Sequence, residues 1–154
     1  MFKRLIITLA SALVIGAIGV SGAMAATSHA ASTTKSGATV QVQSSRYGKV
    51  LFDGNGRVLY LFGRDRGTHS TCSGACAKAW PPFLTKDAPR AGAGITRALL
   101  GTTRRGDGSV QVTYAGHPLY HFQGDAKPGQ IKCQNVSNFG GLWLIVRPSG
   151  NPVR

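Results

Sequence analysis

Short apolar runs separated by glycine-rich polar stretches are the main pattern of this chain beyond its first 45 residues. The apolar run Val50–Phe52 is followed by the turn sequence Asp53–Gly56 and then by a second run, Arg57–Phe62. Two apolar segments flanking an Asp-Gly-Asn-Gly turn predict a β-hairpin. Further along, Val110–Tyr114 alternates apolar and polar positions, as a half-buried strand does.

Similar patterns predict three more strands, at residues 95–103, 117–122 and 142–146. Residues 73–80 are compatible with one or two helical turns that end at Pro81 and Pro82, because proline cannot continue a helix. Many short strands and one short helix indicate an all-β domain.

One motif, an aromatic pair followed by an aspartate, occurs twice at an offset of 60 residues. Its copies are Tyr60-x-Phe62-x-x-Asp65 and Tyr120-x-Phe122-x-x-Asp125. Each copy is followed by a loop with cysteine and then by a tryptophan, Trp80 or Trp143. Duplicated units of this kind predict a small antiparallel β-sandwich or barrel-like domain of two pseudo-symmetric repeats, about 47–84 and 107–147.

These copies resemble the secreted repeat family of predicted bacterial lipoproteins that carry a Y-x-[FWY]-x-x-D motif. The stretches at residues 70–82 and 114–120 resemble it too, so the resemblance spans about 47–153. The family is named for lacking a known function, and the resemblance therefore implies no particular activity. No cysteine lies at the end of the N-terminal apolar run, where a lipid would be attached, so we do not expect lipid attachment at an N-terminal Cys.

The N-terminal region predicts export. Lys3 and Arg4 precede the apolar run Leu5–Val20, and Ala23-Met24-Ala25 fits a cleavage site, so residues 1–25 read as a signal peptide. An uncleaved anchor is the alternative, but the run is shorter than the roughly 20 residues a membrane helix needs. Residues 26–45 read as a flexible leader before a two-repeat domain at 46–154, although Thr39–Gln43 alternates weakly and is compatible with a first strand. No transmembrane segment is expected after cleavage.

The repeated motif has a structural and a functional interpretation. In a strand, Tyr60 and Phe62 share one face, where they would fill the core, and Asp65 would cap the next loop by accepting backbone N–H bonds. The functional alternative is a ligand or ion held by Asp65 and Asp125. Because the motif occurs twice at equivalent positions, we favour the structural role. The tryptophans are expected in the core, with a surface platform for glycans as the alternative.

The three cysteines are Cys72, Cys76 and Cys133. Export favours a disulfide, and the spacing of Cys72 and Cys76 in a helical turn suits one, which would leave Cys133 unpaired. A pair between Cys133 and either of the others stays open. The alternative is a copper or zinc site that uses Cys72, Cys76 and His69, with His117 and His121 as further imidazoles.

Charge adds a hypothesis about partners. The chain has 18 Lys and Arg but only five acidic residues, all Asp, and a net charge of +13. Such an excess favours anionic cell-wall or membrane-surface material, and no specific nucleic-acid motif is present. Without Glu or a nucleophile motif, we expect a non-enzymatic exported domain at the cell envelope, with no cofactor. A metal-binding or redox-associated protein is the alternative, and an extracellular enzyme ranks third. The oligomeric state is left open.

Overall fold

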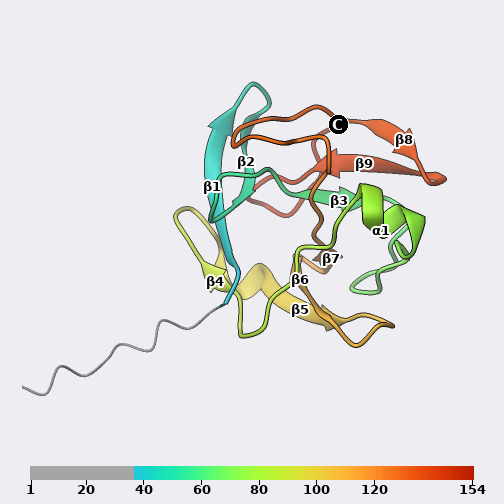
Figure 1. Cartoon of the computed structure of the whole chain (residues 1–154). Coiled ribbons are helices and arrows are strands. Elements are labelled where there is room, and N and C mark those ends of the chain that lie inside the picture. Colours follow the sequence, from blue (N-terminus) through green and yellow to red (C-terminus); the bar gives the residue numbers. More distant parts are fainter. Residues whose placement is uncertain (1–36) are drawn as a thin grey trace, which may run out of the picture. The chain divides into compact units, whose positions relative to one another are not determined.

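The computed structural model describes residues 37–154, so the expected signal peptide and the first part of the leader lie outside it. Within that range the chain forms short strands, one α-helix and one 3-10 turn (Figure 1). The strands are β1 (Thr39–Ser45), β2 (Gly48–Asp53), β3 (Tyr60–Phe62), β4 (Arg90–Ala91), β5 (Leu100–Arg104), β6 (Val110–Tyr114), β7 (His117–Pro118), β8 (Val136–Asn138) and β9 (Gly141–Ile145). The α-helix is α1 (Ala75–Ala79), and the 3-10 turn spans Arg97–Leu99.

The strands are divided among three small sheets, with orders β2-β1-β4, β3-β9-β8 and β5-β6-β7. Within these sheets, every pair of neighbouring strands is antiparallel except β1 and β4, which are parallel. The prediction of an all-β domain with one short helix is confirmed. The barrel-like form finds no support in this division into three sheets. No helix within residues 37–154 has the length and apolar character needed to cross a membrane.

The prediction that residues 26–45 form a flexible leader extends too far toward the C-terminus. Thr39–Ser45 form β1, which pairs with the whole of β2 from Val40 opposite Asp53 to Ser45 opposite Gly48. The Val40 side chain is completely buried. The weak alternation at Thr39–Gln43 is therefore a real strand signal, and the ordered domain begins before Tyr47.

The predicted hairpin between β2 and β3 forms only at its turn. Phe52 makes an isolated bridge to Val58, and the Leu59 N–H donates to the Leu51 carbonyl at 3.0 Å. Beyond that point β3 pairs with β9, with Tyr60 opposite Ile145. The hairpin prediction is wrong for the second strand, because β1 occupies one edge of β2 and β9 offers β3 a longer ladder.

Other predicted strands shift or shorten. The strand expected at 95–103 is the 3-10 turn followed by β5, and the strand expected at 117–122 is reduced to β7 plus single bridges made by Tyr120. The strand expected at 142–146 is β9. In the loop expected between the second motif copy and Trp143, Val136–Asn138 form β8. The sequence did not indicate this strand, because its side chains are mostly polar and exposed.

Strands β2, β3 and β9 are buried on both faces, which explains their continuous apolar sequences. Along β3, Tyr60 and Phe62 join one buried cluster and Leu61 joins a second one. Along β9, Trp143 and Ile145 join the first cluster and Leu144 joins the second. The three strands therefore form a layer between two apolar clusters, and the repeated motif lies in the first of them.

Candidate functional site

The two copies of the motif meet at the interface between the repeats. The backbones of Tyr60 and Tyr120 exchange two hydrogen bonds, each N–H donating to the other carbonyl at 2.9 Å. Their side chains then cross over. The Tyr60 hydroxyl donates to Asp125 Oδ2 at 2.6 Å, and the Tyr120 hydroxyl donates to Asp65 Oδ2 at 2.7 Å. Each tyrosine is thus bound by the aspartate of the other repeat.

The second carboxylate oxygen of each aspartate holds its own loop. Asp65 Oδ1 accepts from the Thr71 N–H at 2.7 Å and from the Thr71 hydroxyl at 3.0 Å. Asp125 Oδ1 accepts from the Lys132 N–H at 3.0 Å. Backbone acceptance of this kind is what the loop-capping interpretation predicts. The cross-repeat tyrosine bond is an addition that the sequence did not reveal.

An aromatic column lies beside these pairs. Trp80 and Trp143 stack at its centre with ring centroids 3.9 Å apart and planes 3° from parallel. Phe62 stacks on Trp143 at 4.2 Å, and Phe122 lies against Trp80 at 4.6 Å. Each phenylalanine therefore packs on the tryptophan of the other repeat. Both tryptophans are fully buried, so they are core residues and not a surface platform.

Burial fixes the protonation state of the motif tyrosines. Desolvation, followed by the hydrogen bond to Asp125, raises the pKa of Tyr60 far above its usual value. Desolvation also raises the pKa of Tyr120, with Asp65 contributing in the same direction and Ser70 opposing it. Both hydroxyls are neutral donors at any physiological pH, and both oxygens of each motif carboxylate accept hydrogen bonds from groups within the domain. This arrangement is a structural lock between repeats.

A buried arginine, Arg105, extends the lock. Its guanidinium donates to the Ser70 hydroxyl at 2.8 Å, to Gln111 Oε1 at 2.6 Å and to the Cys72 carbonyl at 2.6 Å. The Ser70 and Tyr120 hydroxyls lie 2.7 Å apart. Because the single Tyr120 proton goes to Asp65, Ser70 donates to Tyr120, and an ordered chain runs from guanidinium to carboxylate.

Arg46 makes a comparable contact with the loop that follows the second motif. It precedes the first motif, and its guanidinium donates to the Ile131 carbonyl at 2.7 Å in the loop after Asp125. Each loop that follows a motif aspartate is thus held by an arginine from the other repeat. Sequence reasoning missed both arginines, and the adjacent pair Arg104-Arg105 gave no indication of which one is buried.

The cysteines pair as favoured from their spacing. Cys72 and Cys76 form a disulfide with Cα atoms 5.3 Å apart, and Cys133 is free and partly buried. Desolvation raises the pKa of the Cys133 thiol, and the nearby Asp125 carboxylate adds to that shift. A raised pKa keeps Cys133 protonated and unreactive at neutral pH.

The copper or zinc hypothesis gains no support from these positions. Sulfurs joined in a disulfide are not thiolate ligands, and the part of the chain that the structure describes contains no group of three metal-ligating side chains. His69 lies on the surface in a hollow of about 470 Å³, which we call the His69 hollow; its other lining residues are Arg64, Arg66 and Thr71. Two guanidinium groups make that environment unfavourable for a cation.

A buried histidine, His121, lies beside Asp53. His121 Nε2 is 3.5 Å from Asp53 Oδ2, and Asp53 Oδ1 accepts the N–H groups of Asn55 and Arg57 at 2.9 and 2.8 Å. Burial lowers the pKa of His121, and the charge of Arg57 lowers it further while Asp53 opposes both. The pair therefore fixes the Asp53–Gly56 turn with a neutral imidazole. It is enclosed, since both residues are below one-tenth exposed.

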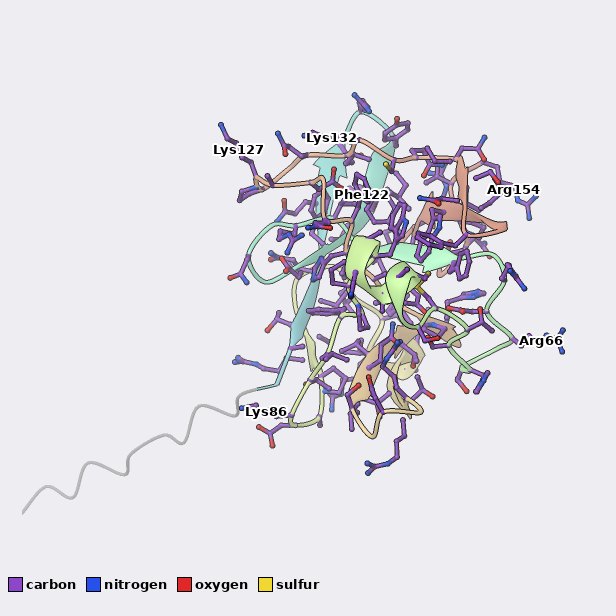
Figure 2. The ribbon with its side chains drawn as sticks, turned by 45° about the vertical axis from the view of Figure 1, so that its right-hand side comes forward. Arg66, Lys86, Phe122, Lys127, Lys132 and Arg154 are labelled. Atoms are coloured by element: carbon purple, nitrogen blue, oxygen red, sulfur yellow. A yellow bond between two sulfur atoms is a disulfide. The ribbon has the colours of Figure 1, made fainter. Side chains whose placement is uncertain are left out.

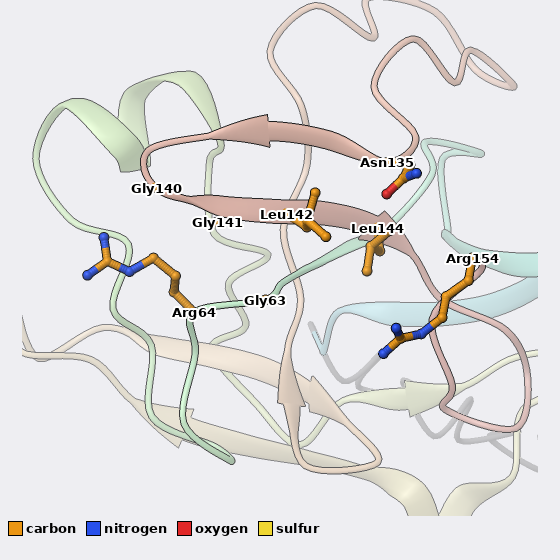
Figure 3. A pocket seen from close by; sticks show the side chains of 8 residues that line it. All are labelled: Gly63, Arg64, Asn135, Gly140, Gly141, Leu142, Leu144 and Arg154. Carbon is orange, nitrogen blue, oxygen red and sulfur yellow. The ribbon is translucent and has the colours of Figure 1, made fainter.

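A groove of about 490 Å³ lies along β9 (Figure 3). We call it the β9 groove; it is lined by Gly63, Arg64, Asn135, Gly140, Gly141, Leu142, Leu144 and Arg154. Figure 3 shows Leu142 and Leu144 between the two arginines, with Arg64 near the β8–β9 turn and Arg154 near the end of the chain. Arg64 also lines the His69 hollow, so the two features adjoin.

The model of a family described as a secreted repeat of unknown function (Lipoprotein_15) matches residues 41–83 and 101–147, and the two matches contain the two motifs. The chain belongs to this secreted repeat family. No curated protein and no solved structure matches it. The resemblance inferred from the motif is thus confirmed, and the expectation of export agrees with the family's description.

The structure brings together most of the residues singled out in the sequence. All eight motif and tryptophan positions of the two repeats meet in one cross-repeat interface, and two of the cysteines pair. His69 lies apart from that interface, in a surface hollow. The residues that sequence reasoning missed are those of the β9 groove, because scattered arginines carry no signal of proximity until β3, β9 and the C-terminal segment are placed side by side.

Proposed function

We propose that this secreted repeat protein is a non-enzymatic domain that binds anionic material of the bacterial cell envelope through its basic surface. The observation that carries the proposal is the way the acidic residues are used. Asp53, Asp65 and Asp125 accept hydrogen bonds from backbone N–H groups, and Asp65 and Asp125 accept from tyrosine hydroxyls as well. Their charges are therefore directed inward.

Cations, in contrast, are numerous and exposed. Fifteen of the 18 Lys and Arg residues fall within residues 37–154, together with all five Asp. Among these described residues, the only Lys or Arg within ion-pair distance of an Asp is Arg105, 3.8 Å from Asp107. Figure 2 shows Arg66, Lys86 and Lys127 extending from different edges of the molecule. A surface of uncompensated positive charge attracts polyanions over a distance of about the Debye length.

Two observations favour binding over catalysis. The motif carboxylates are occupied by neutral donors, so none of them is placed as a general acid or base facing solvent. The buried His121 has a lowered pKa and is enclosed by Asp53 and Phe83, with the Phe83 ring centroid 5.2 Å away. A group enclosed in this way does not reach a substrate.

The test is co-sedimentation of the purified protein with isolated bacterial cell walls. We expect binding at low ionic strength and release between about 0.1 and 1 M NaCl, because the Debye length falls from about 10 to about 3 Å over that range. Neutral polysaccharide particles are the control and should bind nothing. Binding that persists in high salt would contradict the proposal, and binding that a chelator abolishes would replace it with a metal-dependent interaction.

A further inference from the structure

The β9 groove has the features of a specific binding site and not only of a charged surface. Its floor is apolar, since Leu144 is buried and Leu142, although 45% exposed, lies beside it on β9. Arg64 and Arg154 stand toward its two ends (Figure 3). Both arginines are exposed, and within residues 37–154 neither forms an ion pair with an Asp side chain.

The position of Arg64 is built into the β8–β9 turn. Its Nη1 donates to the Phe139 carbonyl at 3.2 Å. A Cβ added at Gly141 would lie 2.6 Å from Arg64 Cγ and 2.7 Å from Phe62 Cε2, so only glycine leaves room for the Arg64 stem. Gly140, with φ +77°, has a backbone conformation that also favours glycine. The turn therefore shapes one end of the groove around this guanidinium.

The ligand chemistry follows from this lining. A guanidinium presents paired N–H donors that match the oxygens of a phosphate or carboxylate. Two such groups separated by leucine side chains suit a ligand whose anionic groups are separated by a short spacer with C–H groups that can contact the leucines. The His69 hollow shares Arg64 and adds Arg66, so further anionic groups along the same ligand would meet further positive charge. Adjoining hollows of one sign favour a chain-like polyanion over a single small anion.

We infer that the β9 groove binds a phosphodiester polymer of the envelope, with phosphates at Arg64 and Arg154 and the polyol spacer over Leu142 and Leu144. This inference rests on the proposed function and gives it a site. It differs from general adhesion, because it makes two of the exposed arginines far more important than the others.

The test compares two double variants of equal charge. The groove variant is Arg64→Gln/Arg154→Gln, and the control is Arg90→Gln/Arg104→Gln. The pairs are matched: Arg64 and Arg104 each donate one exposed bond to a carbonyl, whereas the side chains of Arg154 and Arg90 donate none to residues 37–154. The control arginines lie in β4 and at the end of β5, low in the view of Figure 1, away from the labels of β8 and β9.

Binding of poly(glycerol phosphate) to the purified protein is measured by isothermal titration calorimetry, and thermal unfolding is followed to confirm that each variant stays folded. We expect the groove variant to lose at least about tenfold in affinity, the equivalent of one charge-assisted hydrogen bond. The control should lose less than about threefold. NMR shifts on titration should concentrate at Gly140, Gly141 and Leu142.

Other outcomes separate the two proposals. Equal losses in both variants would overturn the groove while leaving envelope adhesion intact, and no salt-sensitive binding by any form would overturn both. Two probes test the ligand class. Equal affinity for polyglutamate of the same charge would overturn the assignment to phosphodiesters. Tighter binding to phosphatidylglycerol vesicles, lost in the groove variant, would assign the groove to lipid headgroups instead.

Discussion

At the scale of single residues, the aspartate of each motif links three segments of chain. Asp125 is only 1% exposed, and its two oxygens accept from Tyr60 in the other repeat and from the Lys132 N–H in its own loop. A buried carboxylate is stable only when such donors satisfy it. The identity of the motif follows from this requirement, because tyrosine supplies both a ring for the core and a hydroxyl for the carboxylate.

Replacement of one motif tyrosine tests the lock. Tyr60→Phe removes a donor from a buried carboxylate, and we expect the free energy of unfolding to fall by about 1–3 kcal/mol. The control is Tyr114→Phe, whose lost hydroxyl donates to the Pro148 carbonyl at 2.8 Å. The same hydroxyl accepts from the Thr96 N–H at 3.3 Å, so its loss leaves one acceptor and one donor, both neutral and partly buried. Its effect should be smaller than that of an unsatisfied buried carboxylate. Urea unfolding measures both, and an equal or larger effect of Tyr114→Phe would contradict the role given to Asp125.

Alkaline pH tests the same tyrosines. An unfolded tyrosine ionises near pH 10, whereas burial raises the pKa of Tyr60 and Tyr120 in the folded protein. The stability that these buried, protonated tyrosines give the fold is fully present below about pH 10. It is lost as pH rises above that value, because only the unfolded chain releases these protons. Each tyrosine should lower the free energy of unfolding by about 1.4 kcal/mol per pH unit there. Urea titrations from about pH 9 to 11.5 should show a shallower decline in Tyr60→Phe, and parallel curves would contradict the assignment.

At the scale of elements, the loop after β3 is held by its disulfide and by α1. The helix has five residues, too few to be stable alone, and its Cys76 side chain joins Cys72 in the core. The backbone carbonyl of Cys72 accepts a hydrogen bond from Arg105. The disulfide therefore helps to keep the Ser70 hydroxyl next to Tyr120.

Mass spectrometry and unfolding test this element. The oxidised protein should be two hydrogens lighter than the reduced chain, with one alkylatable cysteine, Cys133, after denaturation. We expect Cys72→Ala/Cys76→Ala to lower the free energy of unfolding by at least about 2 kcal/mol, the chain-entropy value for so short a loop. Cys133→Ala is the control and should change it by less, because its side chain is only partly buried. Three alkylatable thiols in untreated protein would contradict the pairing.

The elements also show where sequence patterns succeed. Strand β6 was predicted from the alternation of apolar and polar residues in Val110–Tyr114, and β9 from its continuous apolar run. The alternation suggested a half-buried strand, but Gln111 and Thr113 are buried too. Strand β8 was missed because it is an exposed edge strand, between Asn135 and Phe139 with positive φ angles of 58° and 52°. Its conformation comes from pairing with β9, a tertiary contact that leaves no apolar pattern in the sequence.

At the scale of the whole molecule, an internal repeat predicts equivalent positions but not which repeat supplies each partner. The offset of 60 residues shows that Tyr60 corresponds to Tyr120 and Asp65 to Asp125. It does not show that Tyr60 reaches Asp125 and not Asp65, since both arrangements keep the symmetry. The same holds for the stacking of Phe62 on Trp143. The β9 groove depends on this exchange, because Arg64 follows β3 and the floor belongs to β9.

Exchange of partners predicts that neither half folds alone. A fragment of residues 37–94 keeps β3 but loses β9, its only ladder partner, and loses the acceptor of Tyr60 and the ring that stacks on Phe62. We expect circular dichroism and proton NMR to show each of the fragments 37–94 and 95–154 without a cooperative thermal transition, whereas the intact domain unfolds in one. An equimolar mixture should recover native-like dispersion, because the missing contacts are intermolecular in it. A single fragment that unfolds cooperatively would contradict this prediction. It would show that one repeat can fold with its tyrosine bound to its own aspartate, and that the crossed pairing is not required for folding.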